Sequence, residues 1–142
     1  VDYVYRWNPD TDAYEYSHYI ETLGWKGDFS EIDRTNGFWF HCTSDPAEDL
    51  ELYGIPDGPV QIGLKADWNL VSWQKTSSQS IADALGDIAQ YVDYIYRWNP
   101  DTDAYEYSHY IETLGWKGDF DTLDPDYGYW FHCLENCTWD LT

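Results

Sequence analysis

Aromatic and polar residues alternate along residues 1–7, with aromatic side chains at positions 3, 5 and 7. A period of two is typical of a β-strand that buries one face. The turn-forming run Asn-Pro-Asp-Thr-Asp follows at residues 8–12, and the aromatic alternation resumes over residues 13–20. Proline at a fixed φ, flanked by Asn and Asp side chains that cap turns, predicts a β-hairpin here.

The same pattern returns 91 residues further along the chain, because residues 92–133 repeat residues 1–42. In both copies we expect the hairpin to be followed by a loop in which two glycines bracket a Trp, and then by a closing strand, at residues 38–42 in the first copy. Surface positions are copied as well, which packing alone would not require, so the spacing predicts a repeat architecture. The copies differ at eight positions: Val4/Ile95, Ser30/Asp121, Glu31/Thr122, Ile32/Leu123, Arg34/Pro125, Thr35/Asp126, Asn36/Tyr127 and Phe38/Tyr129.

The segment between the two copies predicts further elements. After an acidic linker, residues 50–55 and 60–64 suggest a second hairpin, and residues 68–73 suggest a strand. Residues 81–91 carry apolar side chains at helical spacing, with Ser80 as a candidate N-cap. Gly86 costs about 1 kcal/mol relative to Ala in a helix, so this short helix must pack on a sheet.

These elements predict a mainly β fold with one short helix per complete module, either β-sandwich-like or α+β, built as a tandem repeat. We assign residues 1–49 to an N-terminal half-module with its linker and residues 50–142 to a complete module. The half-module has no strand and helix in front of it. Residues 50–73 could be shared between the halves, or the missing partner belongs to other residues or to a neighbouring molecule, since an unpaired sheet edge is a template for another strand.

Three short runs carry a family resemblance. They are Trp-Asn-Leu-Val-Ser at residues 68–72, Gly-Tyr-Trp at residues 128–130 and Glu-Asn-Cys-Thr-Trp at residues 135–139. With the short helix and the Tyr- and Trp-rich hairpin, they resemble β-rich modules of bacterial and archaeal secreted or cell-surface proteins, although Asp67 replaces the usual glycine. The resemblance implies an exported, non-catalytic building module and transfers no functional residue.

The net charge of -20 and the pI of about 4.1 narrow the choice of partners. A strongly negative surface repels phosphate backbones and anionic lipids, so we expect neither nucleic-acid binding nor membrane insertion. The chain also lacks an apolar run approaching the roughly 18 residues that a membrane span requires.

Paired acidic residues in the hairpin turns are calcium candidates, namely Asp10, Asp12, Asp101 and Asp103. Their alternation resembles a calcium loop, but the glycine and late Glu of an EF-hand are missing, and the adjacent proline favours a plain turn. Neighbouring His and Cys residues on a strand point to opposite faces, which disfavours a transition-metal site. We therefore predict no cofactor, with loosely held calcium as the alternative.

The cysteines Cys42, Cys133 and Cys137 are odd in number. In an oxidising compartment one pair would close and one thiol would remain for an intermolecular bond, whereas three reduced, buried thiols are the alternative. The pairing stays open. Asn136 lies in an Asn-Cys-Thr sequon and would carry a glycan if the protein is exported.

Tyrosines and tryptophans form two groups. The strand residues Tyr94, Tyr96, Trp98, Tyr105 and Tyr107 either fill a core or form a platform for sugar rings, and their alternation favours a core. The glycine-flanked Trp25 and Trp116 have less reason to be buried, so they are the candidates for an assembly or glycan contact.

These features favour a structural protein, extracellular or at the cell surface, that assembles with copies of itself into a filament, sheath or surface layer. A carbohydrate-binding surface module that uses exposed Trp and Tyr is the alternative. An enzyme is the least favoured class, because no nucleophile with a nearby general base is identifiable.

Overall fold

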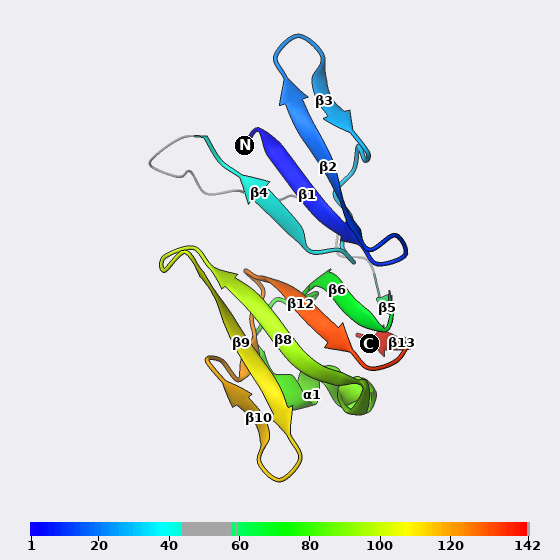
Figure 1. Cartoon of the computed structure of the whole chain (residues 1–142), viewed down its shortest axis with the longest axis vertical. Coiled ribbons are helices and arrows are strands. Elements are labelled where there is room, and N and C mark those ends of the chain that lie inside the picture. Colours follow the sequence, from blue (N-terminus) through cyan, green and yellow to red (C-terminus); the bar gives the residue numbers. More distant parts are fainter. Residues whose placement is uncertain (44–57, 59, 142) are drawn as a thin grey trace.

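The computed structural model describes residues 1–43, 58 and 60–141 (Figure 1). It is mainly β and contains one short α-helix, which confirms the predicted secondary-structure class. The elements are β1 (Tyr3–Asn8), β2 (Ala13–Ile20), β3 (Gly24–Gly27), β4 (Phe38–His41), β5 (Gln61–Leu64), β6 (Asp67–Ser72), β7 (Gln79–Ser80), α1 (Ile81–Leu85), the 3-10 helix η1 (Gly86–Tyr91), β8 (Val92–Asn99), β9 (Ala104–Ile111), β10 (Gly115–Gly118), β11 (Thr122–Leu123), β12 (Gly128–Cys133) and β13 (Cys137–Asp140).

The two copies of the repeat build equivalent antiparallel sheets. The N-terminal sheet has the strand order β3-β2-β1-β4, and the C-terminal sheet has the order β10-β9-β8-β12-β6. The hairpins keep the same register, since Tyr5 faces Tyr16 in the first copy and Tyr96 faces Tyr107 in the second. Both predicted hairpins are therefore confirmed, and the C-terminal sheet differs from the N-terminal one by the added strand β6.

The segments around the two glycine-flanked tryptophans are short strands, so the prediction of a loop was wrong for them. β3 pairs with β2, and β10 pairs with β9. Gly27 has a φ of +156°, and a Cβ there would lie 2.2 Å from the carbonyl oxygen of Tyr16. The glycine lets the chain return this close to β2, which a larger residue would prevent.

The predicted helix over residues 81–91 is interrupted. Its N-terminus is capped as expected, because the Ser80 hydroxyl accepts a hydrogen bond from the Asp83 backbone N–H. The α-helix ends at Leu85, and Gly86, with a φ of +50°, begins a 3-10 helix. The helix packs against the C-terminal sheet with Ile81 and Leu85 buried, as its low propensity requires.

The predicted second hairpin is only partly described. Its first strand, residues 50–55, and the linker before it lie outside the described residues. Its second strand exists as β5, which pairs with β13 near the C-terminus. This pairing was not visible in the sequence, because it joins segments about 75 residues apart.

The deepest core lies on one side of the C-terminal sheet, under α1 and β13. Ile95 and Phe131 from the sheet, Leu123 from β11 and Trp139 from β13 are among its fully buried side chains. β8 is a strand as predicted, but its buried positions are Val92 and Ile95, not the tyrosines.

On the opposite face of the C-terminal sheet, Tyr94, Tyr105 and Tyr107 are exposed, so the core interpretation was wrong for these three side chains. Tyr96 and Trp98 are half-buried.

The two sheets meet through reciprocal aromatic contacts. Trp39 of β4 lies 5.4 Å from Trp98 of β8, and its repeat equivalent Trp130 of β12 lies 5.3 Å from Trp7 of β1. Each copy therefore presents the same residue to the same site on the other, which is the pattern of a two-fold contact. Figure 1 shows the N-terminal sheet, in blue and cyan, beside the C-terminal sheet, with α1 against the C-terminal sheet alone.

β6 touches both copies but pairs fully with only one. It forms a six-residue ladder with β12. On its other side, the backbone N–H of Gly37 donates to the Leu70 carbonyl at 3.0 Å, and Trp7 Nε1 donates to the Trp68 carbonyl at 3.0 Å. β6 therefore contacts both sheets, but it is a strand of the C-terminal sheet alone. The N-terminal sheet keeps its four strands.

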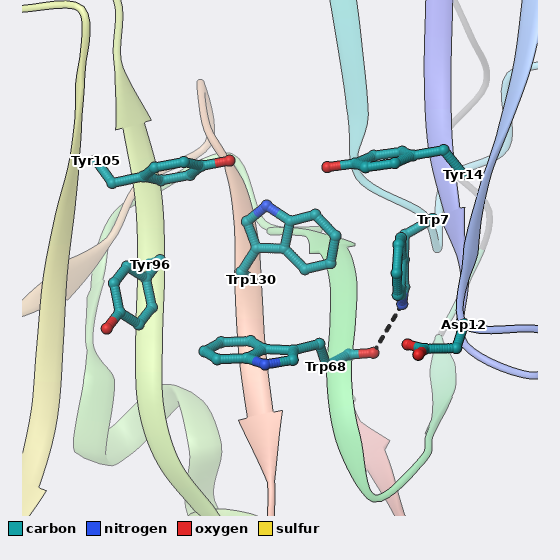
Figure 2. A pocket seen from close by; sticks show the side chains of 7 residues that line it. All are labelled: Trp7, Asp12, Tyr14, Trp68, Tyr96, Tyr105 and Trp130. Atoms are coloured by element: carbon teal, nitrogen blue, oxygen red, sulfur yellow. Dashed lines mark hydrogen bonds between the residues drawn. The ribbon is translucent and has the colours of Figure 1, made fainter.

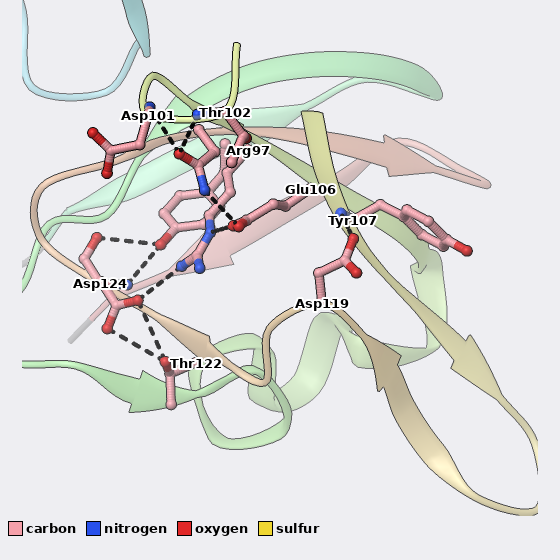
Figure 3. Close-up of polar contacts among 10 residues, drawn as sticks. Arg97, Asp101, Thr102, Glu106, Tyr107, Asp119, Thr122 and Asp124 are labelled. Carbon is pink, nitrogen blue, oxygen red and sulfur yellow. Dashed lines mark hydrogen bonds and ion pairs between the residues drawn. The ribbon is translucent and has the colours of Figure 1, made fainter. Parts of the chain in front are cut away.

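An arginine fixes the closing loop of each copy. Arg97 binds Glu106 at 2.6 Å and Asp124 at 3.0 Å (Figure 3). Its guanidinium also stacks on Phe120 and Tyr127. A hydrogen bond from Asn99 and the contact with Arg97 hold the pKa of Glu106 below its ordinary value.

In the N-terminal copy, Arg6 makes the matching contacts with Glu15 at 2.6 Å, Asp33 at 3.6 Å and the ring of Phe29. The second stacking ring has no counterpart there, because Asn36 replaces Tyr127.

Candidate functional site

Identical and near-identical residues have different surroundings in the two copies. Val92 is 2% exposed, whereas its equivalent Val1 is 44% exposed. Leu123 is 0% exposed, whereas its equivalent Ile32 is 48% exposed. One face that is core in the C-terminal copy is thus open in the N-terminal copy.

We call this open face the acceptor surface and define it by Val1, Val4, Phe29, Ile32 and Phe40 together with the outer edge of β4. Its residues line a shallow cavity of about 200 Å³. Trp25 and Glu31 stand at the same cavity and add an aromatic ring and a negative charge to it.

The C-terminal copy shows what covers the equivalent face. We call residues 67–91, from β6 to η1, the donor segment. β6 pairs along β12, β7 pairs with β11, and the Ile81 backbone N–H donates to the Asp121 carbonyl at 2.9 Å. One continuous stretch therefore supplies both the missing strand and the apolar cover.

The outer edge of β4 carries no partner strand in the described part of the chain. β4 pairs with β1 on one side, with Phe40 opposite Val4. At its other side the hydrogen bond from Gly37 to β6 marks the beginning of the strand, and no further ladder follows within residues 1–43 and 60–141. Such an edge presents unpaired N–H and C=O groups to a further strand.

Six of the eight substitutions between the copies lie in residues 30–36, beside the acceptor surface. The contacts there differ accordingly, since Arg34 Nε donates to the Gln74 side chain at 3.3 Å and the Arg34 carbonyl accepts from the Ser72 hydroxyl at 3.0 Å. Proline occupies the Arg34 position in the other copy. The copies have thus diverged at a place where the C-terminal copy is covered by the donor segment and the N-terminal copy contacts Ser72 and Gln74 of it.

Asp33 anchors this divergent loop. Its carboxylate accepts hydrogen bonds from the backbone and side chains of Thr35 and Asn36. Burial raises its pKa, but the hydrogen bonds from Asn36 and Thr35 outweigh that effect, so the pKa lies below its ordinary value. The loop beside the acceptor surface is therefore held by an ionised carboxylate.

The two predicted contact tryptophans have different environments. Trp25 is 42% exposed and packs edge-on against Tyr19 at 5.7 Å. Trp116 is half-buried against the core, and its Nε1 is buried with no hydrogen-bond partner. They belong to different sheets, so the structure does not bring them together in one site.

The three cysteines are free thiols, and no pair lies at disulfide distance. Cys42 is exposed, Cys133 is buried and Cys137 is half-buried. Burial, reinforced by the nearby Cys137 thiol, raises the pKa of Cys133 to about 12. Of the three, Cys42 is the one that stands open to solvent.

The remaining candidates lie at separate places. Asp10, Asp12, Asp101 and Asp103 occupy the hairpin turns, where Asp10 forms an ion pair with Lys65 at 2.9 Å. Within the part of the chain that the structure describes, no group of three acidic, His or Cys side chains is placed to hold a metal ion. Asn136 is exposed, and its side-chain oxygen accepts a hydrogen bond from the Ala66 backbone.

No protein-family model, curated protein or solved structure matches this chain. The family resemblance inferred from its short runs therefore stays a prediction. Among the described residues, no helix is long and apolar enough to cross a membrane.

The acceptor surface was only half visible in the sequence. The order of elements indicated that a strand and a helix precede the C-terminal copy. Which side chains this leaves open depends on how residues 30–36 fold over Phe29 and Phe40, and no local pattern reports that.

Proposed function

We propose that the chain is a structural protein, extracellular or at the cell surface, that assembles with copies of itself into a filament, sheath or surface layer. The acceptor surface is the contact through which a second copy binds. The observation that carries the proposal is the difference in exposure between Ile32 and Leu123, which occupy equivalent positions in the two copies.

The number of donor segments, compared with the number of sheets that they can cover, supports an intermolecular contact. The described residues contain two equivalent sheets but one donor segment. That segment already packs on the C-terminal sheet. Two molecules can therefore satisfy their open edges by pairing β4 with β4 of the neighbour, which also places the two apolar faces side by side. This isologous pairing closes a dimer, and growth into a filament or layer requires a further contact between such dimers. Strand addition at an open edge is an established mode of protein association.

The contact between the copies within one chain also supports association of like with like. The reciprocal packing of Trp39 and Trp130 shows that one copy of the repeat binds another through a two-fold arrangement.

The expected strength of one contact is modest. A fully buried Val, Leu, Ile or Phe side chain contributes about 1.5–3 kcal/mol, so completing the burial of Val1 and Ile32 adds roughly half of that for each. Each edge hydrogen bond adds about 0.5–1.5 kcal/mol. Each chain carries a net charge of -20, and the repulsion between two such chains opposes association. Salt screens that repulsion, so assembly should increase with ionic strength.

Assembly is tested by offering the acceptor surface a donor in the same chain. A second copy of residues 67–91 is joined directly to Val1, just as residues 67–91 precede Val92 in the natural chain. We expect the wild type to form higher-mass species in light scattering and regular assemblies in electron microscopy at raised salt. The donor-fused chain should remain monomeric, and its amides at residues 38–41 should gain protection from hydrogen exchange.

A matched control carries the same fusion with Asp in place of the Leu and Val that correspond to Leu70 and Val71. This donor cannot pack its strand, so the variant should assemble like the wild type. A wild type that stays monomeric at high concentration in both low and high salt would contradict the proposal.

The carbohydrate-binding alternative retains Trp25, which lines the acceptor cavity, and the exposed tyrosines Tyr94, Tyr105 and Tyr107. It predicts that Trp25→Ala weakens retention on polysaccharide columns, whereas Trp116→Ala, at the equivalent half-buried position, does not. Equal retention of both variants and the wild type would remove this alternative.

A further inference from the structure

A second cavity lies between the two copies, on the opposite side of the sheets from the acceptor surface. Its volume is about 390 Å³, which is within the range of small-molecule sites. Six aromatic rings line it, from β1, β2, β6, β8, β9 and β12: Trp7, Tyr14, Trp68, Tyr96, Tyr105 and Trp130. We call these rings and Asp12, the remaining lining residue, the aromatic cage (Figure 2).

The rings meet at nearly right angles. Trp130 makes interplanar angles of 86° with Trp68, 71° with Trp7 and 90° with Tyr14. In Figure 2, Trp68 below, Tyr14 and Tyr105 above and Trp7 at one side surround Trp130. The arrangement is an open box of ring faces and edges built around the Trp130 ring.

The electrostatics of the box favour a positive charge. Aromatic faces carry negative quadrupole potential and attract a cation, more strongly where water is displaced. The Asp12 carboxylate stands at the cavity and has no hydrogen-bond or ion-pair partner among the described residues. It is held there by the hairpin turn, where Asp12 has a φ of +52°.

The polar groups of the box suit a cation better than a sugar. Trp7 Nε1 already donates to the Trp68 carbonyl, so this donor is occupied. Burial raises the pKa of Tyr14, with a further contribution from the nearby Tyr105, and burial also raises the pKa of Tyr105. Both phenols therefore stay neutral at physiological pH, and Asp12 supplies the only formal charge among the lining residues.

We infer that the aromatic cage binds a quaternary ammonium group, with its methyl groups against the rings of Trp68 and Trp130 and its charge balanced by Asp12. Recognition of this ligand class by several perpendicular rings and one carboxylate follows from the cation–π interaction. This inference does not depend on the proposed assembly function, because it uses the faces of the two sheets that lie opposite the acceptor surface.

The repeat provides a matched control. Asp103 is the equivalent of Asp12, but it does not line the cavity. The asymmetry arises because the described chain has one β6, which places Trp68 5.5 Å from Tyr96 on one side of the two-fold contact. Substituting either Asp removes the same charge from the same kind of exposed turn, so only a local effect distinguishes them.

The test measures binding of choline chloride to the full chain by calorimetry and tryptophan fluorescence, at constant ionic strength. 3,3-Dimethylbutanol, which has the same shape without the charge, serves as the neutral comparison. We expect saturable choline binding and at least about tenfold weaker binding of the neutral compound, since cation–π attraction distinguishes them. Asp12→Asn should weaken choline binding by about fivefold through loss of the charge partner, whereas Asp103→Asn should leave it unchanged.

A ring substitution gives a second readout. Trp68→Leu should abolish saturation, and the more conservative Trp68→Phe should retain part of it, with circular dichroism confirming that both variants fold. Equal affinity for choline and 3,3-dimethylbutanol, equal effects of the two Asp substitutions, or tighter binding of a neutral oligosaccharide would each overturn the inference.

Comparing choline with phosphocholine and with a trimethyl-lysine peptide identifies the kind of molecule that carries the ammonium group. Preference for phosphocholine would identify a lipid or polysaccharide headgroup, and preference for the peptide would identify a methylated protein. Either preference supports the cage. Absence of binding by all three compounds refutes it.

Discussion

Truncating the same repeat position in each copy should have very different effects on stability. Leu123 is fully buried under the donor segment, whereas its equivalent Ile32 is 48% exposed on the acceptor surface. Leu123→Ala removes buried methyl groups and leaves a cavity, which costs about 2–5 kcal/mol. Ile32→Ala removes a side chain that is about half hydrated and leaves no enclosed cavity, so we expect a cost of about 1 kcal/mol or less.

Urea unfolding of the dilute, monomeric protein measures this difference. With an m value of about 2 kcal/mol/M, a loss of about 3 kcal/mol lowers the midpoint by roughly 1.5 M, and a loss of 1 kcal/mol lowers it by roughly 0.5 M. Native-state hydrogen exchange reports on each strand by itself, so exchange of β3 and β10 should assign each effect to its own copy.

In the assembly assay we expect substitution of Ile32 to have the larger effect, although substitution of Leu123 has the larger effect on monomer stability. Ile32→Asp should leave the monomer folded and strongly reduce the assembled fraction in light scattering at raised salt, because it places a charge in the intermolecular contact. The reasoning would be refuted if Ile32→Ala and Leu123→Ala lowered the midpoint equally in the dilute monomer. That outcome would mean that Ile32 is already covered within its own chain.

Three further predictions concern local chemistry. Gly118→Ala should destabilise the protein by about 1–3 kcal/mol, because the φ of +156° and a Cβ placed 2.2 Å from the Tyr107 carbonyl strain the backbone, whereas Gly63→Ala, with open space around it, should be nearly neutral in thermal unfolding. Iodoacetamide at neutral pH should label the exposed Cys42 first and Cys133, whose pKa is about 12, only after unfolding, as mass spectrometry would show; equal labelling rates in the native protein would contradict the assigned burial. The Asp33 pKa lies below its ordinary value of 3.8, so its ionised form stabilises the protein above that pH and this contribution is lost as the pH falls through the lower, folded-state pKa; Asp33→Asn should remove that part of the acid dependence, and an unchanged acid profile would contradict it.

Local patterns were sufficient for the elements themselves. The Asn-Pro-Asp-Thr-Asp turns specify both hairpins, and Ser80 followed by Asp83 specifies the start of α1, because turn and cap chemistry depends on neighbours within a few residues. The short strands β3 and β10 were missed, since their pairing depends on a close backbone approach that Gly27 and Gly118 permit. The pairing of β5 with β13 was also invisible, because it joins distant segments.

Burial and the two binding surfaces were decided by the tertiary structure. The sequence alone determined that the chain is β-rich and duplicated, and that a strand and a helix precede its second copy. It could not determine that Leu123 is buried whereas Ile32, at the equivalent position of the first copy, is exposed. Exposure depends on what packs across from a side chain, and one donor segment covers only one of two equivalent sheets. The aromatic cage arises for the same reason, since Trp7, Trp68 and Trp130 meet only when the two sheets pack together.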